Sequence, residues 1–268
     1  MMNRRLFAGS IAALSASALL SQPSFAKAAA PIRNVVLVHG LFADGSSWGK
    51  VIPILQRAGL NVTAVQNPLT SFQEDVDATR RALALQDGPT VLVAHSYGGM
   101  VISEAGIDPK VSALVYVAAR APDAGEDYGA LARRFNTPPA TAGIVWTPDG
   151  FGQLSEQAFV RDFAGDLDPA EARAYYAVQG RVAKATPAAK TTVAAWRTKP
   201  SWYAVSTQDR TIDTDLERFM AKRMNANTIE LAASHVSLLS RPQEVASLIL
   251  DASVGASVGA SGAQRDFS

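Results

Sequence analysis

The chain has 268 residues with 48% hydrophobic content, which is enough for one domain with a well-filled core. It carries 25 Lys and Arg residues against 24 Asp and Glu residues, a formal net charge of +1, so no overall field favours a nucleic acid or an anionic membrane as partner. The chain contains no cysteine, which excludes disulfides, thiolate metal sites and cysteine nucleophiles.

The N-terminus has the features of an export signal. A basic start with paired Arg4 and Arg5 precedes an apolar run over residues 8–20, and small residues at 24 and 26 occupy the positions that a signal peptidase reads. The apolar run is shorter than the roughly 20 residues that span a bilayer, which favours a removed signal over an uncleaved anchor. The arginine pair resembles a twin-arginine signal, with Sec export as the alternative. We therefore expect residues 1–26 to be removed and the protein to be periplasmic or secreted.

Short apolar strands then alternate with amphipathic helices. This order predicts an α/β fold, a mostly parallel sheet covered by helices on both faces, over residues 32–251. The predicted strands are 34–38, 61–65, 90–93, 112–117, 201–206 and 228–231. The predicted helices are 48–58, 72–85, one directly after residue 96, 214–224 and one after Pro242.

Two segments depart from this alternation. Residues 121–199 are rich in alanine, proline and aromatic residues, too apolar for a disordered loop, and they are inserted between two strands. We expect them to form a mostly helical cap over the carboxyl ends of the strands. The repetitive tail over residues 252–268 has few large side chains to bury, so we expect it to be disordered.

The segment from Val91 to Met100 predicts a nucleophilic serine. An apolar, β-branched run breaks at Ser96 and continues as a helix, so Ser96 lies at the apex of a sharp strand-to-helix turn. Such a turn strains the serine backbone and requires small residues two positions before and after it, a need that Ala94 and Gly98 meet. Ala94 replaces the first glycine of the Gly-x-Ser-x-Gly pattern. The alternative is a buried strand followed by an ordinary serine turn.

A serine hydroxyl needs a base within hydrogen-bond reach to become a nucleophile. The chain offers three histidines. His95 adjoins Ser96, but adjacent residues at a sharp turn point in different directions. His39 follows the first strand, where a histidine more often ties down a loop. His235, in the loop after the last strand, is the predicted base.

The acid that orients this base should lie in the loop after one strand, and the histidine in the loop after the next strand along the chain. Asp209 occupies that place, just after strand 201–206. Asp213 and Asp215 are the alternatives, but they lie where a helix begins, and aspartates there usually cap the helix or complement its dipole.

Two backbone N–H groups should bind the developing oxyanion. One belongs to Tyr97, directly after the predicted nucleophile. The other should come from the loop after the first strand, where Gly40 lets the chain turn and presents the amide of Leu41. Phe42 is the alternative to Leu41, because a shift of one residue is invisible in sequence.

Five motifs together carry a resemblance to a known family: residues 36–40, 44–48, 94–99, 208–212 and 234–237. They resemble the small α/β-hydrolases grouped with plant methyl-salicylate-type esterases and hydroxynitrile lyases, in their exported bacterial branch. The likeness covers about residues 34–250. It implies the α/β-hydrolase fold and a Ser96, His235 and Asp209 triad.

Two positions bear on the choice between esterases and lyases. Lyases of that group carry a lysine after the catalytic histidine and a threonine after the first-strand histidine, whereas this chain has Val236 and Gly40. The resemblance therefore implies hydrolysis of small carboxylic esters through an acyl-enzyme intermediate. The alternatives are a lactone hydrolase, a hydroxynitrile-lyase-like enzyme and a non-catalytic small-ligand receptor. No cofactor is implied, and three histidines spread over separate loops make a poor metal site.

Overall fold

The structure is a computed structural model that describes residues 31–262. The predicted signal over residues 1–26 and the last residues of the tail, 263–268, lie outside the described residues. Within residues 31–262, no helix combines the length and the apolar character needed to cross a bilayer.

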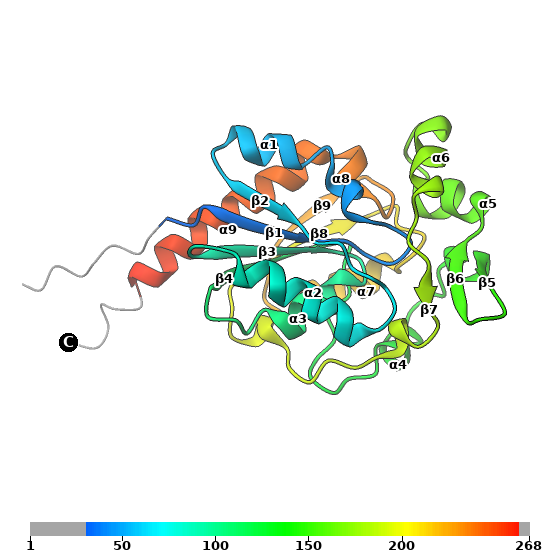
Figure 1. Ribbon diagram of the computed structural model, residues 1–268, viewed down its shortest axis with the longest axis horizontal. Coiled ribbons are helices and arrows are strands. Elements are labelled where there is room, and N and C mark those ends of the chain that lie inside the picture. The colour runs from blue at the N-terminus through cyan, green and yellow to red at the C-terminus, as the bar shows by residue number, and fades with distance from the viewer. Residues whose placement is uncertain (1–30, 263–268) are drawn as a thin grey trace, which may run out of the picture.

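A six-stranded sheet forms the centre of the molecule (Figure 1), and every neighbouring pair of its strands is parallel. The strands are fully buried near the middle of the sheet because helices cover both faces, which explains their continuous Val and Leu runs. In spatial order the strands are β2 (Asn61–Ala64), β1 (Asn34–Val38), β3 (Thr90–His95), β4 (Val111–Val117), β8 (Ser201–Ser206) and β9 (Asn227–Leu231).

The helices cover the two faces of this sheet, with α1 and α9 on one face and α2 and α3 on the other (Figure 1). The chain runs from β1 outward to β2 and then returns to the opposite side of β1 for β3, so the direction of winding reverses between β1 and β3. Open parallel sheets bind ligands at the carboxyl ends of such strands. The helices are α1 (Ile52–Arg57), α2 (Phe72–Ala84), α3 (Gly98–Ala105), α7 (Thr214–Arg223), α8 (Ser237–Ser240) and α9 (Pro242–Gly262), with a 3₁₀ turn η1 (Gly45–Trp48).

The inserted segment forms a cap, but it is less helical than expected. It contains a three-stranded antiparallel sheet of β5 (Ile144–Trp146), β6 (Phe151–Leu154) and β7 (Val182–Ala183). A turn at Gly150, whose φ is +86°, joins β5 to β6, and a Cβ on Gly152 would lie 2.7 Å from the Trp146 ring. The helical parts are α4 (Tyr128–Ala132), η2 (Pro139–Gly143), α5 (Glu156–Ala158), the π-helical turn η3 (Phe159–Phe163), α6 (Pro169–Ala177), η4 (Thr186–Ala188) and η5 (Ala195–Arg197).

The tail also differs from the expectation, because helix α9 continues through residues 252–262. Ala252 is fully buried and Ala256 is 7% exposed. A Cβ on Gly255 would lie 2.9 Å from the Trp202 ring of β8. The small residues that predicted disorder therefore allow the helix to pack closely against the sheet, and alanine itself favours the helix.

Candidate active site

Ser96 lies in the sharp turn between β3 and α3 that the sequence predicts. Its φ is +54°, a left-handed conformation that is strained for a residue with a side chain. Its carbonyl oxygen accepts hydrogen bonds from the N–H groups of Gly99 (3.0 Å) and Arg120 (2.9 Å), which hold the turn. A Cβ on Gly98 would lie 2.8 Å from the carbonyl oxygen of His39, so the predicted need for a small residue is confirmed there. A Cβ on Gly99 would lie 2.2 Å from the carbonyl oxygen of Arg120, a requirement that the sequence pattern did not reveal.

Three side chains from distant parts of the chain form one line of hydrogen bonds. The distance from Ser96 Oγ to His235 Nε2 is 2.8 Å, and that from His235 Nδ1 to Asp209 Oδ2 is 2.5 Å. Ser96 is 4% exposed, and the side chains of His235 and Asp209 are fully buried. When Nδ1–H donates to the carboxylate, Nε2 is left to accept the hydroxyl proton of Ser96. The structure thus brings together the three side chains that the sequence selected.

The loop that carries Asp209 fixes the orientation of its carboxylate. Its other oxygen, Oδ1, accepts hydrogen bonds from the N–H groups of Thr211 (2.6 Å) and Ile212 (2.9 Å). Asp213 instead caps α7, where it accepts hydrogen bonds from two amides of the first turn. Asp215 pairs with Arg218 on the surface. The two alternative aspartates are therefore structural, as expected from their place at a helix start.

The two remaining histidines shape the loops around this site. His39 Nδ1 donates to the carbonyl oxygen of Gly40 (2.9 Å), and its Nε2 accepts from the N–H of Asn67 (2.9 Å), so it ties down the loop after β1. His95 Nε2 donates to the carbonyl oxygen of His235 (2.9 Å). Burial lowers the pKa of both imidazoles, which keeps them neutral.

The loop after β1 passes directly beside Ser96. A Cβ on Gly40 would lie 2.6 Å from Ser96 Cβ and 3.2 Å from Ser96 Oγ. Among the described residues, neither the N–H of Leu41 nor that of Tyr97 has an acceptor within the protein. The N–H of Phe42 is equally unpaired, and this residue has a φ of +58°. The predicted donors thus lie on the two loops that meet at Ser96.

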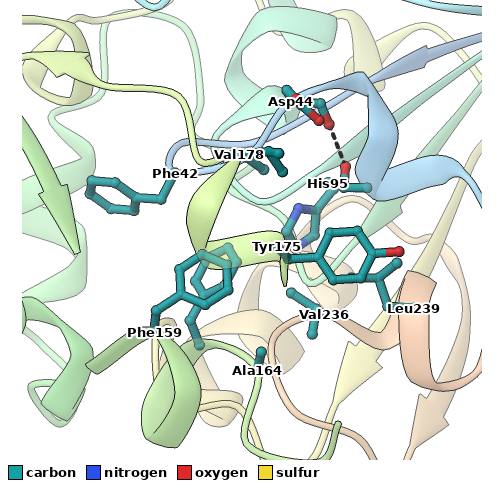
Figure 2. A pocket seen from close by; sticks show the side chains of 12 residues that line it. Phe42, Asp44, His95, Phe159, Ala164, Tyr175, Val178, Val236 and Leu239 are labelled. Atoms are coloured by element: carbon teal, nitrogen blue, oxygen red, sulfur yellow. Dashed lines mark hydrogen bonds between the residues drawn. The ribbon is translucent and has the colours of Figure 1, made fainter. Parts of the chain in front are cut away.

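A small pocket lies between these loops and the cap (Figure 2). His95 from the turn, Val236 from the histidine loop and Phe42 from the loop after β1 line it, and each is next in sequence to a predicted site residue. Phe159 and Tyr175 of the cap line the same pocket (Figure 2). The lining is mostly apolar, and it consists of Phe42, Ala43, Asp44, Ser47, His95, Phe159, Phe163, Ala164, Tyr175, Val178, Val236 and Leu239.

An ion pair connects the cap to the acid loop. Asp162 lies in η3 between two pocket residues, and its carboxylate is fully buried. It accepts hydrogen bonds from Arg161 and from Nε of Arg210 (2.8 Å), which directly follows Asp209. The hydrogen bonds from Arg161, and then those from Arg210, lower the pKa of Asp162. Sequence gave no signal for this link, because Asp162 stands in a segment without periodicity.

A second carboxyl group, that of Asp75, holds the residue that follows Ser96. The hydroxyl of Tyr97 donates to Oδ2 of Asp75 (2.8 Å), and the N–H of Leu69 donates to Oδ1 (2.8 Å). Burial raises the pKa of Asp75 to about 6. Across residues 31–262, no group of three or more His, Cys, Asp or Glu side chains is arranged to hold a metal ion.

The parallel sheet, the strained serine turn and the inserted cap define an α/β-hydrolase fold. Residues 35–248 match the sequence model described as the alpha/beta hydrolase family, and the chain belongs to this family. The resemblance that the five motifs carried is therefore confirmed.

Some curated relatives are similar over most of the chain, and others over less than half of it. Alpha/beta hydrolase nvfD of Aspergillus novofumigatus is 27% identical over 242 residues, which cover 81% of this chain and 95% of that protein. Methylesterase 7 of Arabidopsis thaliana is 27% identical over 262 residues, which cover 82% of this chain and 95% of that protein. Esterase PIR7B of Oryza sativa subsp. japonica is 30% identical over 129 residues, 42% of this chain and about half (48%) of that protein.

Solved structures share the fold at lower sequence identity. The crystal structure of polyneuridine aldehyde esterase superposes with a TM-score of 0.69 at 20% identity and covers 82% of this chain and 98% of its own. A pyrethroid hydrolase from Sphingobium faniae JZ-2 superposes with a TM-score of 0.68 at 21% identity, and the match covers 83% of this chain and 97% of that protein.

Proposed function

We propose that this protein is a serine hydrolase that cleaves small carboxylic esters through an acyl-enzyme intermediate. The observation that carries the proposal is the line of hydrogen bonds from Ser96 through His235 to Asp209, beside an apolar pocket. This is the arrangement in which a serine becomes a nucleophile. Relatives named as esterases and methylesterases support an ester as the substrate.

In the first half of the reaction, Ser96 Oγ attacks the ester carbonyl carbon and its proton passes to His235 Nε2. Asp209 stabilises the imidazolium that results. The carbonyl oxygen becomes an oxyanion, which the N–H groups of Leu41 and Tyr97 bind. When the C=O bond re-forms, the bond to the alcohol oxygen breaks, and the alcohol leaves with the proton from His235.

In the second half, a water molecule replaces the alcohol. It gives a proton to His235 as its oxygen attacks the acyl carbon, and the same N–H groups bind the new oxyanion. Ser96 Oγ then leaves with the proton from His235, and the carboxylic acid is released. A lactone reacts through the same steps, but its alcohol stays attached to the acyl group.

The pocket favours a compact apolar acyl or alcohol group. Aromatic and aliphatic side chains make up most of its lining, and they leave little room between them. Val236, which is 2% exposed, provides no cation near His235 to stabilise a departing anion such as cyanide. This favours ester hydrolysis over hydroxynitrile cleavage.

A fluorophosphonate probe tests the nucleophile. Mass spectrometry of the labelled wild-type protein should place the adduct on Ser96, and Ser96→Ala should remain folded but lose both labelling and the hydrolysis of p-nitrophenyl esters. Ser240→Ala, which changes a serine outside the pocket, should behave like wild type. An adduct on another serine would contradict the proposal.

We also propose that residues 1–26 direct export through the twin-arginine route. The support is the basic start with Arg4 and Arg5, the short apolar run and the small residues around position 26.

A further inference from the structure

Glu217 is a buried carboxyl group behind the proposed catalytic acid. It lies in the first turns of α7, and none of its surface is exposed. Its Oε2 accepts a hydrogen bond from the N–H of Ser206 at the end of β8 (3.1 Å). Its Oε1 is also buried and faces no N–H or O–H donor among the described residues. The carbonyl oxygen of the same Ser206 accepts a hydrogen bond from the N–H of Asp209 (3.2 Å), so Glu217 packs against the turn that carries Asp209. Burial, and then the charge of Asp209 and a side-chain hydrogen bond with it, raise the pKa of Glu217.

Two carboxyl groups form a hydrogen bond only if one of them carries a proton. Asp209 receives three N–H donors, from Thr211, Ile212 and His235, and all three favour its anionic form. Glu217 receives one N–H donor, that of Ser206. The proton of the pair therefore belongs on Glu217. Burial, and then the charge of Asp209, raise the pKa of Glu217 well above its usual range, in agreement with this assignment.

The other groups around Glu217 do not supply a compensating cation at close range. Tyr203 of β8 is fully buried, and its hydroxyl donates to the carbonyl oxygen of Ala119 (2.5 Å). Tyr128 of α4 is buried as well, and burial raises its pKa to about 12, so it stays neutral. The guanidinium of Arg218 attracts Glu217 only weakly, because this guanidinium donates hydrogen bonds to Asp215 and Glu230 on the surface.

We propose that Glu217 is a positioning residue that stays protonated and donates its carboxyl proton to Asp209. The line of hydrogen bonds then contains four side chains: Ser96, His235, Asp209 and Glu217. This inference rests on the proposed function for its catalytic consequence. The donated proton holds Asp209 in place and disperses its charge, so the pair presents a single negative charge to His235.

Two variants separate the hydrogen bond from simple packing. Glu217→Gln keeps the shape, its amide N–H donates to Asp209 and its carbonyl accepts from Ser206, but it never ionises. Glu217→Leu keeps a similar volume and removes the donor. We expect the Gln variant to retain kcat within about twofold and the midpoint of the acid limb of kcat/KM within about 0.3 pH units. The Leu variant should lose about tenfold in kcat, and its acid limb should move upward by about half a unit to one unit, because Asp209 loses a charge-assisted hydrogen bond.

Two outcomes would overturn the inference. If Glu217 is ionised in the wild type, the Gln variant removes a negative charge, and its acid limb moves downward by about one unit or more. If Glu217 only fills space, the Leu variant leaves the acid limb in place whatever it does to stability.

Infrared spectroscopy of protein labelled with ¹³C in its glutamate carboxyl groups supplies a measurement that does not depend on activity. At neutral pH the wild type should show the carbonyl stretch of a protonated glutamic acid, and Glu217→Gln should lack it. Absence of this band in the wild type would refute the protonated state. If the wild type hydrolysed no ester, the proposed function would fail, but this infrared band would still report whether Glu217 is protonated. The band would also decide the protonation state of Glu217 if the Leu variant failed to fold.

Discussion

Asp75 gives the stability of this protein a pH dependence that follows from the structure. Burial raises the pKa of its carboxyl group from 3.8 to about 6, although the N–H of Leu69 and the hydroxyl of Tyr97 donate to it. The folded protein therefore binds this proton more tightly than the unfolded chain does. The stabilising contribution of the proton is complete below pH 3.8, and it is lost as the pH rises through 6.

The magnitude follows from the size of the shift. One pKa unit corresponds to about 1.4 kcal/mol, so a rise from 3.8 to about 6 amounts to at most about 3 kcal/mol in the free energy of unfolding. Asp75→Asn has the same shape and is neutral at every pH, so it isolates this contribution. The unfolding free energy of wild type minus that of Asp75→Asn should fall by about 2 to 3 kcal/mol between pH 4 and pH 8.

Urea unfolding of both proteins across this pH range measures the difference. Asp77→Asn is the matched control, because Asp77 lies on the exposed side of the same helix and pairs with Arg80 in solvent. The unfolding free energy of wild type minus that of Asp77→Asn should not show this fall with pH. A wild-type minus Asp75→Asn difference that stayed flat, or rose with pH, would refute the reasoning, since either result means that the folded protein does not hold the Asp75 proton more tightly.

Three further predictions concern the site and the N-terminus. In steady-state kinetics, Asp209→Asn should lower kcat by about 10⁴-fold, the effect of stabilising the wrong histidine tautomer. Asp213→Asn keeps a good helix cap and should change kcat little. A large loss of kcat in Asp213→Asn instead would make Asp213 the catalytic acid. Gly40→Ala should stay folded by circular dichroism but lose hydrolysis, because the added Cβ would lie 2.6 Å from that of the serine, and retained activity would contradict this clash. Replacing Arg4 and Arg5 by lysine should leave precursor in the cytoplasm on cell fractionation, and unchanged export would favour the Sec route.

The parts of the fold that sequence predicted well are those set by local backbone geometry. Strands β1 and β8 have the predicted bounds, 34–38 and 201–206, because their apolar runs are continuous and end at turn residues. Ser96 was recognisable because its turn tolerates few residue types on either side. Strand order then places the loops of Asp209 and His235 at the same edge of the sheet.

The parts that sequence did not predict depend on contacts between distant segments. The strands of the cap are two to four residues long, too short to show a period, and β7 pairs with a strand far away in the chain. Helix α9 continues past residue 251 because it packs on Trp202, a contact with another element. Glu217 looks like an ordinary charged residue of an amphipathic helix, and only its packing behind β8 shows that it is buried.

Two buried carboxyl groups lie behind the proposed site. Asp75 reaches it through Tyr97, and Glu217 reaches it through Asp209. Burial is the first cause of the raised pKa in both, so the environment behind the site disfavours additional negative charge. Three N–H donors, including that of His235, surround the carboxylate of Asp209 and favour a negative charge on it. A single fixed negative charge in such surroundings acts strongly on the imidazolium that forms during the reaction. A second charge from Glu217 would hold that proton on His235 too tightly to return it to the leaving alcohol, which explains why a neutral, proton-donating partner suits this position.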